Sequence, residues 1–313
     1  MRKTLTLLPL LACLASVPAL AVDIHGHRGA RGLLPENTLP AFREAMTLGV
    51  DVLELDTGMT ADGVVVVSHD RTLSPDLARI GGEWIDGSRT LRSMTLADLQ
   101  AVDVGRTRPG SRTAERFTDQ VPVDGTAMPT LAEVLAMAKS EGPADLEFNI
   151  ETKLSPLAPE ETAAPEEFAA AVVAVIREAG VADRAIVQSF DWRTLSEVKR
   201  IAPEIRTSYL TAARNWLDNV QVKRPGPSPW LGGLDIDDFD GSVPRAIANL
   251  RGDIWSPFHR DLTPEALAEA HALGLEVHVW TVNDGDAMEA LKEMGVDGII
   301  TDYPDIAIQR LRP

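Results

Sequence analysis

The chain has a single cysteine among its 313 residues, and that residue, Cys13, lies close to the N-terminus. A framework of disulfide bonds is therefore excluded, even in an oxidising compartment. Basic residues are also outnumbered by acidic ones. The chain has 30 Lys and Arg and 47 Asp and Glu, which gives a formal net charge of −17. Such an acidic chain is not expected to bind nucleic acid or an anionic membrane surface. An anionic ligand must instead be attracted locally, by a cation or by single Arg and Lys side chains in a cleft.

Long apolar runs are missing after the first residues, and none of the later ones approaches the ~20 residues that a membrane span needs. The N-terminal segment has Arg2 and Lys3, then a mostly apolar stretch, and then Ala19-Leu20-Ala21, which fits a small-x-small cleavage site. We therefore expect a signal peptide over residues 1–21, cleaved after Ala21, and an exported protein, periplasmic or secreted. The alternative is a lipoprotein anchored at Cys13, because Leu10-Leu11-Ala12-Cys13 resembles a lipobox.

Short strand-like runs alternate with helical segments along the rest of the chain, and this alternation indicates a parallel sheet. Eight such strands, in a mature chain of this length, predict an α/β fold of the (β/α)8 TIM-barrel type. An open, doubly wound sheet is the alternative. The predicted barrel strands begin near Asp23, Val50, Leu146, Ala185, Arg206, Ile254, Glu276 and Gly298.

Two segments depart from this repeat. Ala61-Asp62-Gly63 predicts a hairpin turn, and the β-branched run at residues 64–67 then reads as an excursion from the second barrel strand. Residues 71–128 are rich in Arg, Asp, Gly and Thr and show little periodicity. We expect them to form an insertion over the barrel mouth, within a single domain that covers residues 22–313.

Carboxylates lie at the ends of two neighbouring predicted strands. Glu54 and Asp56 are two residues apart, so both point to the same face of the second strand, and Glu151 and Lys153 have the same spacing on the third. Functional groups of such barrels gather at the C-terminal ends of the strands. Solvated strand-end charges are the simpler interpretation of one such pair. Three converging carboxylates beside a lysine instead predict a site for one divalent cation, Mg²⁺ or Ca²⁺ rather than zinc.

Two histidines and two cations accompany these carboxylates. His27 and His69 end predicted strands, and imidazoles exchange protons near neutral pH, so they are the candidates for general acid and base. His69 could equally be a strand-end residue that only bonds to Asp70. Arg28 and Lys153 are suited to bind a phosphate group, the first by its planar fork and the second as a point charge.

Further polar and aromatic residues occupy weaker positions. Gln188 ends a strand and is a candidate for a hydrogen bond to the substrate, while Trp280 is a candidate for packing against it. His25 shares strand parity with His27 but lies deeper, so we expect it to pack in the barrel core. We expect the same of His278.

These motifs, in this order, resemble those of the glycerophosphodiester phosphodiesterase family. The resemblance implies a (β/α)8 barrel that hydrolyses glycerophosphodiesters to glycerol 3-phosphate and an alcohol. It also implies a metal bound by Glu54, Asp56 and Glu151, with His27 and His69 as general acid and base. The motifs run along nearly the whole mature chain: His27-Arg28-Gly29, Pro35-Glu36-Asn37-Thr38, Glu54-Leu55-Asp56, Asp62-Gly63, His69-Asp70, Glu151-Thr152-Lys153, Gln188-Ser189-Phe190, Trp280-Thr281-Val282-Asn283 and Thr301-Asp302-Tyr303-Pro304.

Two other functions are compatible with the same pattern. One is a lysophospholipase D-like activity, which needs an apolar mouth that residues 71–128 could either build or block. The other is a non-catalytic protein that binds glycerophosphodiesters, which loss of a histidine or a metal carboxylate would favour, although all of them are present. The expected partner is therefore a small glycerophosphodiester, and no pattern specifies its alcohol or an oligomeric state.

Overall fold

The computed structural model of the protein describes residues 22–85 and 89–312, so the predicted signal peptide lies outside the described residues. Eight parallel strands form a closed barrel, because β1 pairs with both β14 and β2. This closure confirms the predicted (β/α)8 barrel and excludes the open sheet. The barrel strands are β1 (Asp23–Gly26), β2 (Val52–Met59), β7 (Glu147–Thr152), β8 (Ala185–Ser189), β9 (Arg206–Thr211), β12 (Ile254–Pro257), β13 (Glu276–Val279) and β14 (Gly298–Thr301).

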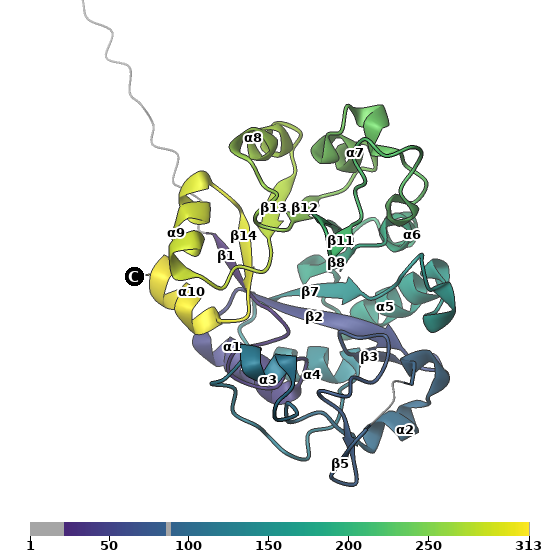
Figure 1. Ribbon diagram of the computed structural model, residues 1–313, viewed down its shortest axis with the longest axis vertical. Coiled ribbons are helices and arrows are strands. Elements are labelled where there is room, and N and C mark those ends of the chain that lie inside the picture. Colours follow the sequence, from purple (N-terminus) through teal and green to yellow (C-terminus); the bar gives the residue numbers. More distant parts are fainter. Residues whose placement is uncertain (1–21, 86–88, 313) are drawn as a thin grey trace, which may run out of the picture.

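A helix follows each barrel strand, and these helices surround the sheet (Figure 1). Local sequence fixes their ends. Thr130 and Glu133 form a capping box at the start of α4, and Gly180 ends α5 in the left-handed region, with φ 65°. The surrounding helices are α1 (Leu39–Leu48), α4 (Leu131–Glu141), α5 (Pro165–Ala179), α6 (Trp192–Ile201), α7 (Val243–Asn249), α8 (Pro264–Ala272), α9 (Gly285–Met294) and α10 (Pro304–Leu311).

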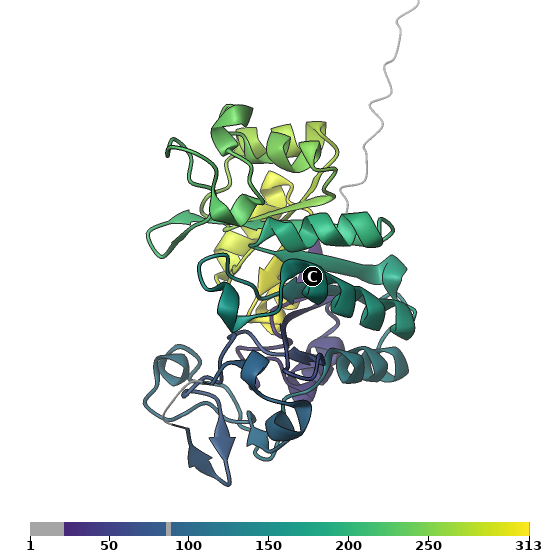
Figure 2. The same cartoon turned by 90° about the vertical axis from the view of Figure 1, so that its right-hand side faces the viewer.

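The segment after β2 starts as predicted, because β3 (Val65–Val67) pairs antiparallel with β2. Residues 71–128 then build a small structure around a core of their own, which includes Leu73, Leu91 and Met128. It lies beside the barrel, below β2 in Figure 1, rather than across the whole mouth (Figures 1 and 2). Its elements are β4 (Arg79–Ile80), β5 (Glu83–Trp84), η1 (Leu91–Ser93), α2 (Leu96–Gln100), β6 (Val102–Asp103) and α3 (Arg112–Arg116).

The remaining connections contain only short elements. Within residues 22–85 and 89–312, no helix is both long enough and apolar enough to cross a membrane. The short elements are η2 (Pro159–Glu161), η3 (Ala182–Arg184), the hairpin β10 (Ala213–Arg214) and β11 (Leu217–Asp218), η4 (Pro229–Leu231) and η5 (Ile236–Phe239).

The interior of the barrel holds a pair of buried histidines, as predicted. The rings of His25 and His278 stand edge to face, with centroids 4.8 Å apart, and both are buried. Gly298 leaves room for them, because a Cβ atom there would lie 2.8 Å from His278 and 2.9 Å from His25. Burial, together with His278 and Arg206, holds the pKa of His25 well below its usual value.

The buried His25 imidazole is expected to make the fold sensitive to acid. Because its pKa is depressed in the folded state, the unfolded chain binds more protons below about pH 6.5, so stability falls as the pH drops through that value. One such histidine lowers the free energy of unfolding by up to about 1.4 kcal/mol for each pH unit below that value. Denaturant unfolding at pH 7.5 and 5.0 should show a smaller acid loss for His25→Asn than for the wild type.

The exposed His271 on α8 provides the control for this measurement, because His271→Asn removes an imidazole outside the barrel. His27 and His69 also have lowered pKa values, so His25→Asn should remove only part of the acid sensitivity. Equal acid losses for His25→Asn and the wild type would show that His25 is not one of the groups responsible.

Candidate active site

Three carboxylates converge at the mouth of the barrel, where the strand pattern predicted them. Glu54 and Asp56 lie on β2, and Asp56 is the direct register partner of Glu151 on β7. One oxygen from each of the three lies within 4.8 Å of the others, and all three side chains are buried. Buried like charges at this spacing are costly without a counter-ion, and a set of oxygen ligands suits a hard cation. The residues present therefore fit a divalent cation.

The nearby cations only partly balance this negative charge. The Lys153 ammonium lies 2.7 Å from Glu151 Oε1 and 3.0 Å from Asp56 Oδ1, and Arg28 Nε lies 3.2 Å from Asp56 Oδ2. Although burial opposes it, Lys153 and Arg28 hold the pKa of Asp56 well below its usual range. Burial and the neighbouring carboxylates raise the pKa of Glu54 well above its usual value. Burial likewise raises the pKa of Glu151, to about 7, against the effect of Lys153.

His27 lies in the turn just after β1, since the strand ends at Gly26 rather than at His27, where the sequence predicted its end. Its Nδ1 atom is 2.6 Å from Asp302 Oδ1, and its Nε2 atom is 4.0 Å from Glu54 Oε2. Burial lowers the pKa of His27, and Asp302 offsets part of that effect. The pKa of Asp302 lies well below its usual value despite burial, because His27 and Arg31 are close to it. An ionised Asp302 accepts a hydrogen bond from Nδ1–H, which leaves Nε2 as the atom that can exchange a proton at the mouth.

Asp302 is the main functional residue to which sequence reasoning assigned no role. Its Oδ2 atom accepts hydrogen bonds from Asn283 Nδ2 at 2.6 Å and from Arg116 at 3.2 Å, and its backbone N–H donates to Asn283 Oδ1. The motifs that contain Asn283 and Asp302 were visible in the sequence, but nothing in them indicated a contact with His27. Asp302 is thus fixed on both oxygens and can orient the imidazole.

Replacing Asp302 with asparagine is expected to lower kcat by at least about tenfold. The amide keeps the shape of the carboxylate but no longer enforces the Nδ1-protonated form of His27 or stabilises its protonated state. Steady-state kinetics on Asp302→Asn should show a change mainly in kcat, with KM nearly unchanged. A loss confined to KM would show that Asp302 acts on substrate binding rather than through His27.

His69 follows β3, and it lines the same cavity at the barrel mouth as His27. Its Nδ1 atom is 2.8 Å from Asp70 Oδ1, the contact anticipated from the sequence, and 35% of its side chain is exposed. Desolvation, with the Arg28 and Lys153 cations close by, lowers the pKa of His69 to about 4. His69 is therefore oriented by a carboxylate, as His27 is, but it lies nearer to the solvent.

The two candidate phosphate-binding residues are engaged with carboxylates. Arg28 donates from Nη1 to Glu36 Oε1 at 2.7 Å and from its backbone N–H to Glu54 Oε2 at 2.9 Å, and its φ of 54° is left-handed. Lys153 lies just beyond β7, where it pairs with Glu151. Both cations nonetheless line one cavity of about 80 Å³ together with His27 and His69. They supply positive charge at its wall.

Gln188 and Trp280, the candidates for contact with the substrate, line the same cavity. Gln188 Nε2 donates to Glu54 Oε1 at 2.7 Å, so it orients a carboxylate of the triad. Asn37 does the same for Asp56, at 2.9 Å. Trp280 lies edge to face with Phe190, and its indole N–H donates to the Ser256 carbonyl. Trp280 and Phe190 together form an apolar part of the cavity lining.

The chain is similar in sequence and in fold to known proteins. Residues 27–306 match the Glycerophosphoryl diester phosphodiesterase family. The glycerophosphodiester phosphodiesterase of Caldanaerobacter subterraneus subsp. tengcongensis is 29% identical, over 91% of this chain and 96% of its own length. A structure from Silicibacter pomeroyi, provisionally assigned as a glycerophosphoryl diester phosphodiesterase, is 39% identical, with a TM-score of 0.82 and 94% of each chain covered.

A phosphodiesterase of Oleispira antarctica, solved in complex with the product sn-glycerol-3-phosphate, shares the fold. It is 22% identical, with a TM-score of 0.69 over 94% of this chain and 98% of its own. The matched family region, residues 27–306, contains His27, all three carboxylates and Asp302.

Proposed function

Because the chain belongs to the glycerophosphoryl diester phosphodiesterase family, we propose that it is an enzyme that hydrolyses glycerophosphodiesters to sn-glycerol 3-phosphate and an alcohol. The observation that most supports this proposal is the single cavity that His27, His69, Lys153, Glu54 and Glu151 line together. Two oriented imidazoles, a cation and a set of carboxylates are the groups that cleavage of a phosphodiester requires.

A divalent cation, Mg²⁺ or Ca²⁺, is proposed to be held by Glu54, Asp56 and Glu151. When bound, it would polarise the phosphodiester and lower the cost of the charge that develops during cleavage. It would also neutralise the repulsion among the three carboxylates. Lys153 and Arg28 supply further positive charge for the phosphate at the wall of the cavity.

His27 is proposed as the first base, because it is deeply buried and its protonated form would be stabilised by Asp302. Its Nε2 atom takes the proton of the glycerol 2-hydroxyl, whose oxygen then bonds to phosphorus as the bond to the alcohol breaks. His69, nearer the solvent, gives its proton to the departing alcohol oxygen. The anionic substrate favours the protonated imidazole that this step needs. Water then opens the cyclic phosphate, with the two histidines in reversed roles.

The proposed location is outside the cytoplasm, either in the periplasm or secreted. Its support is the composition of residues 1–21, with a basic start, an apolar stretch and the small-x-small sequence that ends at Ala21. Mass spectrometry of the mature N-terminus tests it: a chain that starts at Val22 is expected, and an uncleaved chain or a lipid on Cys13 would contradict it.

Release of glycerol 3-phosphate from glycerophosphocholine, measured with a coupled assay, tests the activity. Product should form with added Mg²⁺ or Ca²⁺ and should disappear in excess chelator. Activity that is insensitive to chelator would refute the proposed metal site. A parallel assay with lysophosphatidylcholine tests the lysophospholipase D-like alternative, and binding of glycerophosphocholine without turnover would instead favour a binding protein.

A further inference from the structure

The last part of the insertion is attached to the loop between β1 and α1, the loop that carries His27. Gln120 Nε2 donates hydrogen bonds to the backbone carbonyls of Arg31 and Leu34, at 2.9 and 3.1 Å. These two bonds fix the segment that follows α3 against the first loop of the catalytic face. The insertion therefore contacts the part of the barrel from which one of the two histidines comes.

Phe117 is the apolar anchor of this segment. It follows α3 directly, and only 3% of it is exposed. Its ring packs against Tyr303, with centroids 6.3 Å apart, and Tyr303 follows Asp302 in the chain. The guanidinium groups of Arg31 and Arg116 lie over the same ring, at 4.7 and 5.1 Å from its centroid. Phe117 thus contacts two arginines that both lie close to Asp302.

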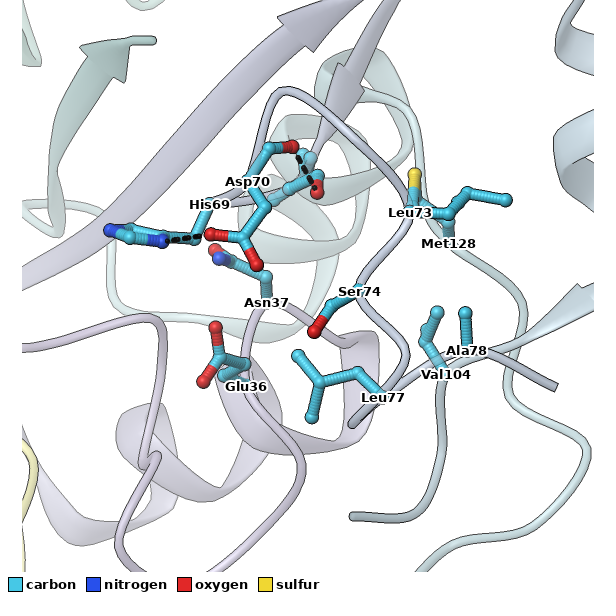
Figure 3. Close-up of a pocket in the computed structure, with 12 residues that line it drawn as sticks. Glu36, Asn37, His69, Asp70, Leu73, Ser74, Leu77, Ala78, Val104 and Met128 are labelled. Carbon is cyan, nitrogen blue, oxygen red and sulfur yellow. Dashed lines mark hydrogen bonds and ion pairs between the residues drawn. The ribbon is translucent and has the colours of Figure 1, made fainter. Parts of the chain in front are cut away.

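The two arginines are engaged differently. Arg31 Nε pairs with Glu36 Oε2 at 2.6 Å, while its Nη1 atom stays 3.9 Å from Asp302 Oδ1. Glu36 in turn lines a small cavity together with His69 (Figure 3), so Arg31 is engaged mainly on that side of the mouth. Arg116 Nη2 instead donates a hydrogen bond to Asp302 Oδ2 at 3.2 Å. Of these two arginines, Arg116 is therefore the one that holds the carboxylate directly.

A second donor to Asp302 Oδ2 restricts how the carboxylate can turn. The terminal torsion of an aspartate is soft, with broad minima. Asn283, in the loop after β13, donates to Oδ2 at 2.6 Å, and Arg116 reaches the same oxygen from the insertion. One bond to Oδ2 leaves the carboxylate free to rotate about that oxygen, whereas two donors from different elements limit the rotation. The position of Oδ1, 2.6 Å from His27 Nδ1, then depends on both donors.

We propose that Arg116 is a positioning residue for catalysis, which fixes Asp302 and thereby holds its other oxygen against His27. The proposal rests on the proposed function, in which His27 is the first base. Arg116 does not line the catalytic cavity, so it acts through Asp302 and not on the substrate. Although burial opposes it, His27 and Arg31 hold the pKa of Asp302 well below its usual value. Loss of Arg116 is therefore expected to change the orientation of this carboxylate and not its ionisation.

Arg116→Ala tests this role. It should lower kcat for glycerophosphocholine by roughly three- to tenfold, the factor that corresponds to the net contribution of one hydrogen bond. KM should stay nearly unchanged, because the substrate does not contact Arg116. More than half of the Arg116 side chain is exposed, so the variant should fold normally, and circular dichroism checks this.

A double variant shows whether Arg116 acts through Asp302. In the Asp302→Asn background, Arg116→Ala should lower kcat much less than it does in the wild type, because the carboxylate that Arg116 positions is already lost. Arg112→Ala is the matched control, since Arg112 is an exposed arginine at the other end of the same helix, α3. It should leave both kcat and KM as they are in the wild type.

Four results would overturn the positioning role and leave the proposed function intact. They are an unchanged kcat in Arg116→Ala, a change confined to KM, an equal fall in Arg112→Ala, and an undiminished loss when Arg116→Ala is added to Asp302→Asn. If the wild type hydrolyses no glycerophosphodiester with Mg²⁺ or Ca²⁺, the proposed function itself fails, and the role of Arg116 with it.

Discussion

His27→Ala and His69→Ala are each expected to lower kcat by about 10²–10⁴-fold, the range that one general acid or base contributes. His27→Ala removes the group that accepts the proton of the attacking hydroxyl, and His69→Ala removes the donor to the leaving alcohol. KM should change much less, since neither imidazole is the main source of positive charge in the cavity. Steady-state kinetics on glycerophosphocholine, with Mg²⁺ present, measures both effects.

The surface histidine of α8 provides the control, because His271→Ala removes an imidazole that pairs with Asp297 and does not line the catalytic cavity. Its kcat should match that of the wild type. His69→Ala should also fold normally, since its side chain is partly exposed. Near-normal turnover in both His27→Ala and His69→Ala, with folding intact, would rule out a mechanism based on these two imidazoles.

Glu54→Gln is expected to lower activity by at least about 100-fold and to weaken the binding of Mg²⁺ or Ca²⁺. Even the loss of a partner outside the ligand shell of a metal typically costs ~10–100-fold. The same change should raise the thermal midpoint of the metal-free protein, because it removes one of three buried carboxylates that repel one another. Calorimetric titration and thermal unfolding of the metal-free protein measure the two effects.

Glu147→Gln is the control for Glu54→Gln, since Glu147 lies at the opposite end of β7 from Glu151 and pairs with Arg206. It should leave metal affinity and activity unchanged. Cation binding by Glu54→Gln that is as tight as in the wild type would show that the triad is not the metal site. So would a fall in activity without a fall in metal affinity.

The barrel and its carboxylates could be predicted because they depend on local patterns. The strand starts follow from apolar runs, and alternation along β2 places Glu54 and Asp56 on one face without knowledge of the rest of the chain. The parallel register with β7 then brings Glu151 beside Asp56. The only further assumption was that neighbouring strands in the sequence are neighbours in the sheet, which is usual in this type of fold.

The contacts that orient the site could not be predicted in this way. Asp302 reaches His27 across 275 positions of the chain because β1 and β14 become neighbours only when the barrel closes. The engagement of Arg28 by Glu36, and of Gln188 by Glu54, likewise depends on where the turns after the strands direct each side chain. A sequence pattern gives the residue type and its strand, but not its partner in three dimensions.

The insertion was recognised by its lack of periodicity but could not be described. Its strands, such as β4 and β6, are only two residues long, which is too short for alternation to be visible. Helix α7 was not predicted either, because its seven residues are too few for a helical pattern to be clear.

Phosphorus NMR of the purified protein with a glycerophosphodiester and Mg²⁺ or Ca²⁺ tests the central claim most directly. The signal of the diester should be replaced by that of sn-glycerol 3-phosphate, and a chelator should stop the conversion. Appearance of the phosphate ester of the other alcohol, or a diester signal that stays unchanged with either cation, would contradict the claim.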